Sequence, residues 1–255
     1  MSVRINRMKQ KLRQGEAAFG GLLRTPEPTL VEVLGYAGYD YVVLDAEHGA
    51  HSFEALDTLI LTAYASGITP IVRVNENTPG LIMRVLDIGA QGVLVPHIKN
   101  AEDARRAVAS ALYPPDGSRG IGPSRGSQFG AIPGDEYFKL MNGEVAVMLM
   151  MEEADAVENI DAITDVTGIT ALSIGLSDLS GSLGVPGQAN HPSVQAAVDR
   201  FMSVAARKGV PVSLSVRSVE EVREALKRGA RLASIGTLET VLFQALRGWL
   251  QNVTH

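Results

Sequence analysis

The sequence predicts an α/β fold in which residues 1–255 form a single (β/α)8 barrel of the TIM type, with an N-terminal helix over one end. Eight short apolar segments alternate with segments of helical character, and no second composition regime interrupts them. This alternation is typical of a barrel of parallel strands with outer helices. The length of 255 residues also suits one barrel domain.

An open doubly wound sheet is the alternative fold, but such a sheet rarely contains eight evenly spaced units. No G-x-G-x-x-G sequence follows a predicted strand and opens a helix. A dinucleotide-binding site therefore has no support in this chain.

The boundaries of the elements follow from apolar patterns and from residues that start or end helices. Ile5, Met8 and Leu12 recur at helical spacing between residues 5 and 14, which predicts the capping helix. Ser52 and Asn100 suit helix N-caps. The predicted strands span residues 18–23, 41–45, 70–74, 92–95, 145–151, 170–174, 211–215 and 232–235. The remaining predicted helices span residues 28–37, 53–66, 79–88, 101–112, 136–141, 154–164, 192–208, 219–228 and 238–250.

The segment from Tyr113 to Gly134 interrupts this alternation. It is rich in glycine and proline and also contains Arg119 and Arg125. A loop of this length inside a compact domain is usually functional or disordered. Its glycines alternate with arginines and aromatic residues instead of forming a uniform polar linker, which favours a functional loop.

The composition narrows the class of protein. The chain is 45% hydrophobic and 20% charged, and its net charge of -5 without a basic block argues against a nucleic-acid partner. The absence of cysteine excludes disulfides, thiolate metal sites and a cysteine nucleophile. Residues 1–14 lack the apolar core of a secretory signal, and no apolar run approaches the roughly 18–20 residues that cross a membrane. We therefore expect a cytoplasmic protein without a membrane partner.

Several predicted strands end in ionisable residues. The strand that begins at Tyr41 ends in Asp45, which is followed by Glu47 and His48, and the next strand ends near Arg73. The carboxyl ends of all barrel strands meet on one face, where the active sites of such barrels lie. We therefore expect these side chains to gather with the polar residues that follow the fifth and sixth strands, namely Glu152, Glu153, Ser177 and Asp178.

This set of side chains predicts a metal-assisted enolate reaction. Carboxylates in a chain without cysteine favour Mg²⁺ or Mn²⁺ over a structural zinc ion. Arg73 suits the stabilisation of an oxyanion. His48 suits a general base, because the pKa of histidine lies near the operating pH. The combination fits proton abstraction next to a carbonyl group.

A Schiff-base mechanism is the alternative, and it requires a lysine at a strand end. Lys99, just beyond the fourth predicted strand, is the nearest candidate, and we expect its amine in solvent. Of the other histidines, His51 is a candidate for touching substrate and His97 for lining the pocket. His191, at a predicted helix start, and the terminal His255 are expected to be structural or incidental.

Several motifs, in this order along the chain, resemble one known family. They are DAEHG at 45–49, VRVN at 72–75, LDIGAQG at 86–92, LVP at 94–96, YPPDGSRG at 113–120 and IGLSDLS at 174–180. They resemble the HpcH/HpaI aldolase family, the metal-dependent class II pyruvate aldolases. Its members include 4-hydroxy-2-oxoheptanedioate aldolase and 2-dehydro-3-deoxyglucarate aldolase. The resemblance extends from about Phe19 to Gly236.

The resemblance implies how the substrate is held. Glu152 and Asp178 would bind a divalent cation, Mg²⁺, Mn²⁺ or Co²⁺. Pyruvate would chelate this ion, and backbone N–H groups of Ser177 and Asp178 would hold its carboxylate. Arg73 would stabilise the enolate.

The resemblance also implies the residues that move protons. His48, assisted by Asp87 in its own or a neighbouring subunit, would carry out the transfer, and Asp45 would support the site. One position departs from the family: close relatives commonly have glutamine where this chain has Met150.

The family likeness further implies a homohexamer in which the last helix is exchanged between subunits, and the apolar residues at 238–250 suit such a helix. The implied reaction is the reversible cleavage of a 4-hydroxy-2-oxo acid to pyruvate, or a related 2-oxo acid, and an aldehyde. Oxaloacetate decarboxylation, or another carbon–carbon cleavage of the citrate-lyase type, is the alternative. A third hypothesis is a non-catalytic barrel that binds 2-oxo acids.

Overall fold

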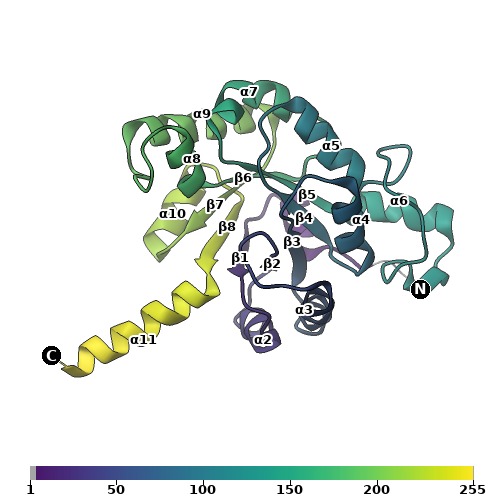
Figure 1. Cartoon of the computed structure of the whole chain (residues 1–255), viewed down its shortest axis with the longest axis horizontal. Coiled ribbons are helices and arrows are strands. Elements are labelled where there is room, and N and C mark those ends of the chain that lie inside the picture. The colour runs from purple at the N-terminus through teal and green to yellow at the C-terminus, as the bar shows by residue number, and fades with distance from the viewer. Residues whose placement is uncertain (1–3, 255) are drawn as a thin grey trace.

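A computed structural model describes residues 4–254 of the chain (Figure 1). The eight strands are β1 (Ala18–Leu23), β2 (Tyr41–Asp45), β3 (Thr69–Arg73), β4 (Gly92–Val95), β5 (Ala146–Met151), β6 (Ala171–Ile174), β7 (Val212–Val216) and β8 (Leu232–Thr237). The helices are α1 (Arg7–Arg13), α2 (Pro28–Tyr36), α3 (Phe53–Ala65), α4 (Pro79–Asp87), α5 (Ala101–Ala111), α6 (Gly134–Glu144), α7 (Ala154–Thr164), α8 (Leu176–Ser182), α9 (Pro192–Lys208), α10 (Val219–Lys227) and α11 (Leu238–Thr254).

The strands form a closed parallel barrel in sequence order, with β8 paired to β1. This confirms the predicted TIM barrel. Parallel strands are buried on both faces, which explains why they appear in the sequence as nearly continuous apolar runs. In β2, for example, all five residues are buried.

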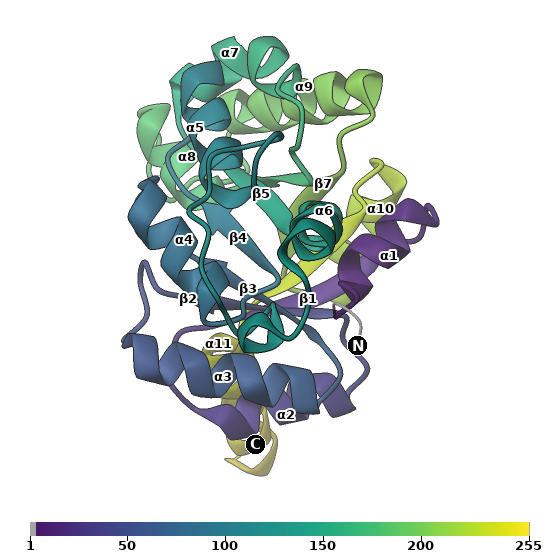
Figure 2. The ribbon, with the colours of Figure 1, turned by 90° about the vertical axis from the view of Figure 1, so that its right-hand side faces the viewer.

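Alternate residues of each strand face two different apolar layers. Outward-facing residues such as Val42 and Leu44 pack against the helices. Inward-facing residues such as Tyr41 and Met148 fill the barrel interior. Met8 of α1 belongs to this interior cluster and is fully buried. Because α1 closes the amino end of the barrel beside the end of α6 (Figure 2), the predicted capping helix is confirmed.

Two segments differ most from the prediction. The turn after β6 contains α8, a short helix that the sequence did not predict. Helix α6 begins at Gly134 and continues to Glu144, so it is longer than the predicted 136–141. The loop before α6 is anchored to the barrel, because Arg119 is only 3% exposed.

The last helix, α11, extends away from the body of the barrel (Figure 1). Its large apolar side chains are exposed, including Phe243 at 60% and Trp249 at 79%. In the part of the chain that the structure describes, no helix is both long enough and apolar enough to cross a membrane.

Candidate active site

A cavity of about 1220 Å³ opens at the carboxyl ends of the strands. Five of the predicted site residues line it, and they come from four different strand ends: His48, Arg73, Glu152, Ser177 and Asp178. Buried strands deliver these polar groups to the rim, because each apolar run ends where the barrel meets solvent.

Arg73 and Asp45 form a buried ion pair at the edge of this cavity. Arg73 donates from Nε to Asp45 Oδ1 over 2.7 Å and from Nη2 to Oδ2 over 2.6 Å. Such a two-point contact fixes the guanidinium plane. Burial by itself raises the pKa of Asp45, but the hydrogen bonds and charge of Arg73 outweigh it and hold this pKa below its usual range. Asp45 is therefore an ionised group that orients Arg73.

Glu47, for which the sequence suggested no role, lies between the arginine and two histidines. Its Oε2 is 3.0 Å from Arg73 Nη1 and 3.8 Å from His48 Nε2. Its Oε1 is 3.2 Å from His97 Nε2. A second carboxylate therefore forms an ion pair with Arg73, at a different guanidinium nitrogen from those that contact Asp45, and lies near both histidines.

Glu152 is 1% exposed, and its two oxygens have different surroundings. Oε1 accepts a hydrogen bond of 2.8 Å from the backbone N–H of His97. Oε2 lies beside Gly175, where an added Cβ would be only 2.8 Å away. His97 has φ of 56°, an unusual value for a residue with a side chain. In this conformation its backbone N–H points to Glu152 Oε1.

The donor set suits a divalent cation that is completed by water and substrate. Among residues 4–254, no three His, Cys, Asp or Glu side chains gather into a metal site of protein ligands alone. Two carboxylates are nevertheless a usual protein contribution to a Mg²⁺ site. Burial raises the pKa of Glu152, and the negative charges of Glu47 and Asp178 raise it further. The hydrogen bond from the backbone N–H of His97 lowers this pKa but does not cancel the rise. A cation at Glu152 and Asp178 would relieve this repulsion.

His48 lies at the open side of the site. Its side chain is 50% exposed and lines the cavity. Its backbone N–H donates to Asp45 Oδ1 over 3.2 Å, which ties the histidine to the carboxylate that orients Arg73.

Comparison with known proteins identifies the family of this chain. Residues 22–245 match the model of the HpcH/HpaI aldolase/citrate lyase family. The chain belongs to this family. It is 36% identical over 233 residues to a 5-keto-4-deoxy-D-glucarate aldolase of Klebsiella pneumoniae, covering 91% of this chain and 90% of the relative.

Two solved structures are also similar to this chain. A HpcH/HpaI aldolase/citrate lyase family protein from Burkholderia cenocepacia is 31% identical, with a TM-score of 0.92, and the match covers 98% of this chain and 100% of that one. The citrate synthase SbnG is likewise 31% identical, with a TM-score of 0.90 and 97% of each chain covered. As a family member, the chain is a carbon–carbon lyase of the aldolase type.

The aldolase barrel does not bring Asp87 to the cavity of its own chain. Asp87 ends α4 and lies before β4, at the amino end of the barrel. Its Oδ1 accepts a hydrogen bond of 2.7 Å from Nη2 of Arg119 in the long loop. Asp87 and His48 of one chain lie at opposite ends of the barrel, because each helix runs back from the carboxyl ends of the strands to their amino ends.

Lys99 is not in the state that a Schiff-base lysine requires. Its amine is 2.9 Å from Glu153 Oε2, and its side chain is 46% exposed. The hydrogen bond and charge of Glu153 raise the pKa of Lys99. A nucleophilic lysine requires the opposite shift, so the geometry disfavours this alternative.

His51, His191 and Met150 have definite positions, whereas His255 lies outside the described residues. His51 Nε2 lies 3.0 Å from the carbonyl oxygen of Leu23, as in a structural contact. His191 caps α9, as a structural role predicts, and also lines the cavity. Met150 places its thioether sulfur 3.8 Å from Arg73 Nη1, so a soft, weak acceptor stands where the family resemblance implies an amide.

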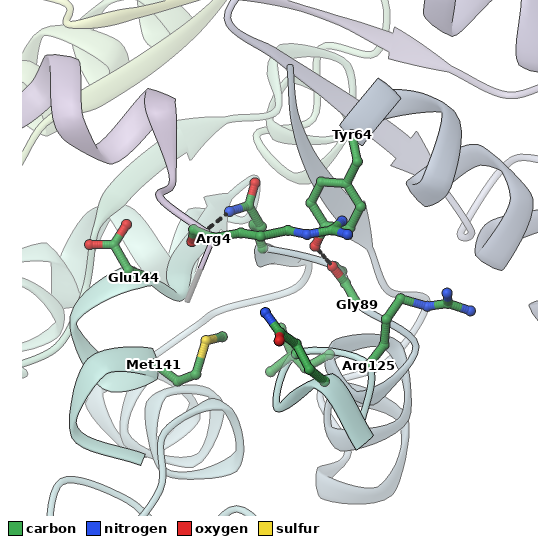
Figure 3. Close-up of a pocket in the computed structure, with 11 residues that line it drawn as sticks. Arg4, Tyr64, Gly89, Arg125, Met141 and Glu144 are labelled. Atoms are coloured by element: carbon green, nitrogen blue, oxygen red, sulfur yellow. Dashed lines mark hydrogen bonds between the residues drawn. The ribbon is translucent and has the colours of Figure 1, made fainter. Parts of the chain in front are cut away.

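A second, smaller pocket lies at the other end of the aldolase barrel (Figure 3). It has a volume of about 40 Å³, and the guanidinium of Arg4 stacks 3.8 Å above the ring of Tyr64 at its edge. None of the predicted site residues lines it. A volume of this size holds only a few water molecules.

Proposed function

We propose that this lyase is a metal-dependent aldolase that reversibly cleaves a 4-hydroxy-2-oxo acid to pyruvate, or a related 2-oxo acid, and an aldehyde. The observation that carries the proposal is the position of Arg73. Asp45 and Glu47 hold its guanidinium at a cavity wall that also contains Glu152 and Asp178. The guanidinium of Arg73 would therefore already be in position to stabilise the negative charge of an enolate oxygen formed there.

Glu152 and Asp178 would hold the cation, which we propose to be Mg²⁺, Mn²⁺ or Co²⁺. When bound, such an ion supplies an electrophile that polarises a carbonyl oxygen. Ser177 and Asp178 lie in the first turn of α8, where backbone N–H groups have no intrahelical acceptor. We propose that these groups bind the carboxylate of the 2-oxo acid.

His48 would act as the general base and acid that accepts and returns protons, including the C3 proton of pyruvate. We propose that Asp87 assists a His48 of a neighbouring subunit, because it lies at the far end of its own barrel. This assignment requires a homo-oligomer, for which we propose the hexamer that the family resemblance implies. The exposed apolar face of α11 supports such an assembly.

Deuterium exchange tests the half-reaction directly. Pyruvate is incubated with the enzyme and Mn²⁺ in D₂O, and loss of the C3 proton signal is followed by NMR. We expect exchange that stops with EDTA and returns with Mg²⁺, Mn²⁺ or Co²⁺. Exchange that persists in EDTA, together with inactivation by borohydride plus pyruvate, would transfer the chemistry to a lysine such as Lys99. The first hydroxy-oxo acid to assay is 5-keto-4-deoxy-D-glucarate, because similar proteins are named as aldolases of this compound.

Oxaloacetate decarboxylation, or another carbon–carbon cleavage of the citrate-lyase type, is the second candidate. The similarity to a citrate synthase at 31% identity favours testing it. Turnover of oxaloacetate is compared with turnover of hydroxy-oxo acids under the same conditions. A clear preference for oxaloacetate would select this second reaction, and both reactions use the same enolate.

A further inference from the structure

Arg24 stands at the rim of the active-site cavity, and neither the motifs nor the proposed chemistry gives it a role. It follows β1 directly. Leu22 packs with the barrel interior and Leu23 with the outer layer, so strand alternation directs Arg24 inward. Arg24 and Arg73 line the same cavity.

Among residues 4–254, the side chain of Arg24 forms a hydrogen bond through one atom, Nε. Its Nε donates to Asp45 Oδ2 over 2.9 Å, and Nη2 of Arg73 donates to the same oxygen over 2.6 Å. Its backbone N–H donates to Glu239 Oε1 over 2.9 Å, which fixes the start of the residue. One carboxylate oxygen therefore sets two guanidinium groups next to each other.

Asp45 does not need Arg24 as a counter-ion. Arg73 already contacts both of its oxygens, and the backbone N–H groups of Glu47 and His48 donate to Oδ1. The side chain of Arg24 is 44% exposed, whereas Asp45 is fully buried. Within residues 4–254, the terminal nitrogens Nη1 and Nη2 of Arg24 donate no hydrogen bond.

A guanidinium with both terminal nitrogens available is shaped to bind a carboxylate at two points. The cavity at Arg73 is where we place the enolate, so a group beside Arg24 belongs to the other half of the substrate. We propose that Arg24 binds an acidic group, a carboxylate, on the aldehyde portion of the hydroxy-oxo acid. This inference rests on the proposed aldolase function.

The test compares acidic aldehydes with neutral aldehydes of equal length. Glyoxylate and succinate semialdehyde are paired with acetaldehyde and butyraldehyde, each with pyruvate as the donor and Mn²⁺ present. We expect the wild type to prefer the acidic member of at least one pair. Arg24→Gln should lower kcat/KM for that acidic aldehyde by about 10- to 100-fold, the effect of losing a charge-assisted hydrogen bond. It should change kcat/KM for the neutral partner by less than about threefold.

Arg217 provides the matched control. It follows β7 and lines the same cavity, but it makes no recorded side-chain contact with Asp45. Arg217→Gln should leave the preference for acidic aldehydes unchanged, and Arg24→Lys should retain part of it.

Three results would overturn the inference. A wild type that shows no preference for acidic aldehydes would do so. So would an Arg24→Gln variant that loses acidic and neutral substrates alike, since the arginine would then only position Asp45. A preference that follows Arg217 would move the subsite. The D₂O exchange of pyruvate separates these results from failure of the aldolase proposal: exchange without turnover of any aldehyde refutes the acceptor site, and absence of exchange refutes the enolate chemistry itself.

Discussion

Gly175 leaves room for one oxygen of Glu152. A Cβ at this position would lie 2.8 Å from Glu152 Oε2 and 2.9 Å from Glu152 Cβ. The backbone of Gly175 has φ of -90°, which any residue can adopt, so the requirement for glycine is purely steric. The other oxygen is already bound to the N–H of His97. The glycine therefore leaves Oε2 as the oxygen that the proposed cation would contact.

Gly175→Ala should weaken cation binding without unfolding the barrel. The methyl group would push Oε2 of Glu152 out of line with Asp178, and we expect the affinity for Mn²⁺ to fall at least about tenfold, as when the support of a ligand is lost. Calorimetric titration of Mn²⁺ without substrate measures this. Gly181→Ala in α8 is the control, because nothing lies within 4 Å of its added Cβ. Equal affinities of the two variants would show that Glu152 does not bind the ion.

Arg73→Ala should remove most of the catalytic rate. Loss of one fixed donor to an oxyanion typically costs about 2–4 kcal/mol of transition-state stabilisation. We therefore expect kcat to fall at least about 30-fold, both in aldol cleavage and in exchange of the C3 proton of pyruvate. Asp45 then loses its buried partner, so circular dichroism must first show that the variant is folded. A near-wild-type kcat would remove Arg73 from the mechanism.

Residues at the ends of apolar runs could be predicted from the sequence, and residues that connect distant strands could not. Asp45 and Glu152 mark abrupt ends of buried strands, a local signal that motif comparison then strengthened. The position of Glu47 against Arg73 and His97 arises only when three strands meet. Arg24 gave no signal either, because its contact with Asp45 joins the ends of two different strands.

At the level of elements, capping helix α1 combines apolar contact with a half-buried cation. Lys9 Nζ donates to the carbonyl oxygen of Val145 over 2.8 Å. Burial, together with the charge of Arg13, lowers the pKa of Lys9 to about 8, although Glu144 opposes this. A lysine in the unfolded chain has a pKa of about 10.4. The unfolded state therefore binds more protons between these two pH values.

It follows that the free energy of unfolding should rise with pH from about 8 to 10.4 because of Lys9. Lys9→Met lacks this group, so wild type and variant should converge across that range, with the variant more stable near pH 7 by about 1–3 kcal/mol. Denaturant unfolding at several pH values measures the difference. Gln10→Met, on an exposed position of the same helix, controls for the added apolar side chain. A difference that does not depend on pH would mean that Lys9 titrates normally in the folded barrel.

Strands were predictable to within a few residues because buried parallel strands are apolar runs bounded by glycine, proline and polar residues. The structure gives Ala146–Met151 where the sequence predicted 145–151. Helix α8 was missed because Gly175, Ser177, Ser180 and Gly181 have the composition of a turn. Packing overrides this weak local preference, since Leu179 and Ser180 are fully buried.

For the whole molecule, α11 is the element that the barrel leaves without a partner. The sequence predicted the helix, and the structure shows it extending away from the barrel (Figure 1). Its exposed apolar residues include Leu242, Phe243, Leu246 and Trp249, at 50% to 79% exposure. Burying one such side chain contributes about 1.5–3 kcal/mol. A second copy of the chain is the partner that the proposed hexamer provides.

Substitution on α11 should therefore reduce assembly and activity together. Phe243→Glu combined with Leu246→Glu places two charges on the apolar face, and we expect sedimentation to shift from a multimer of the 27.1 kDa chain toward the monomer. Asp87 lies at the amino end of its own barrel, so a monomer would lack a partner for His48, and proton exchange should slow even though Arg73 and Glu152 are intact. Gln244→Glu on the same helix adds one negative charge at a polar position and should preserve both properties. A wild type that sediments as a monomer at micromolar concentration while fully active would contradict the shared site and would return Asp87 to a role within the pair that it forms with Arg119.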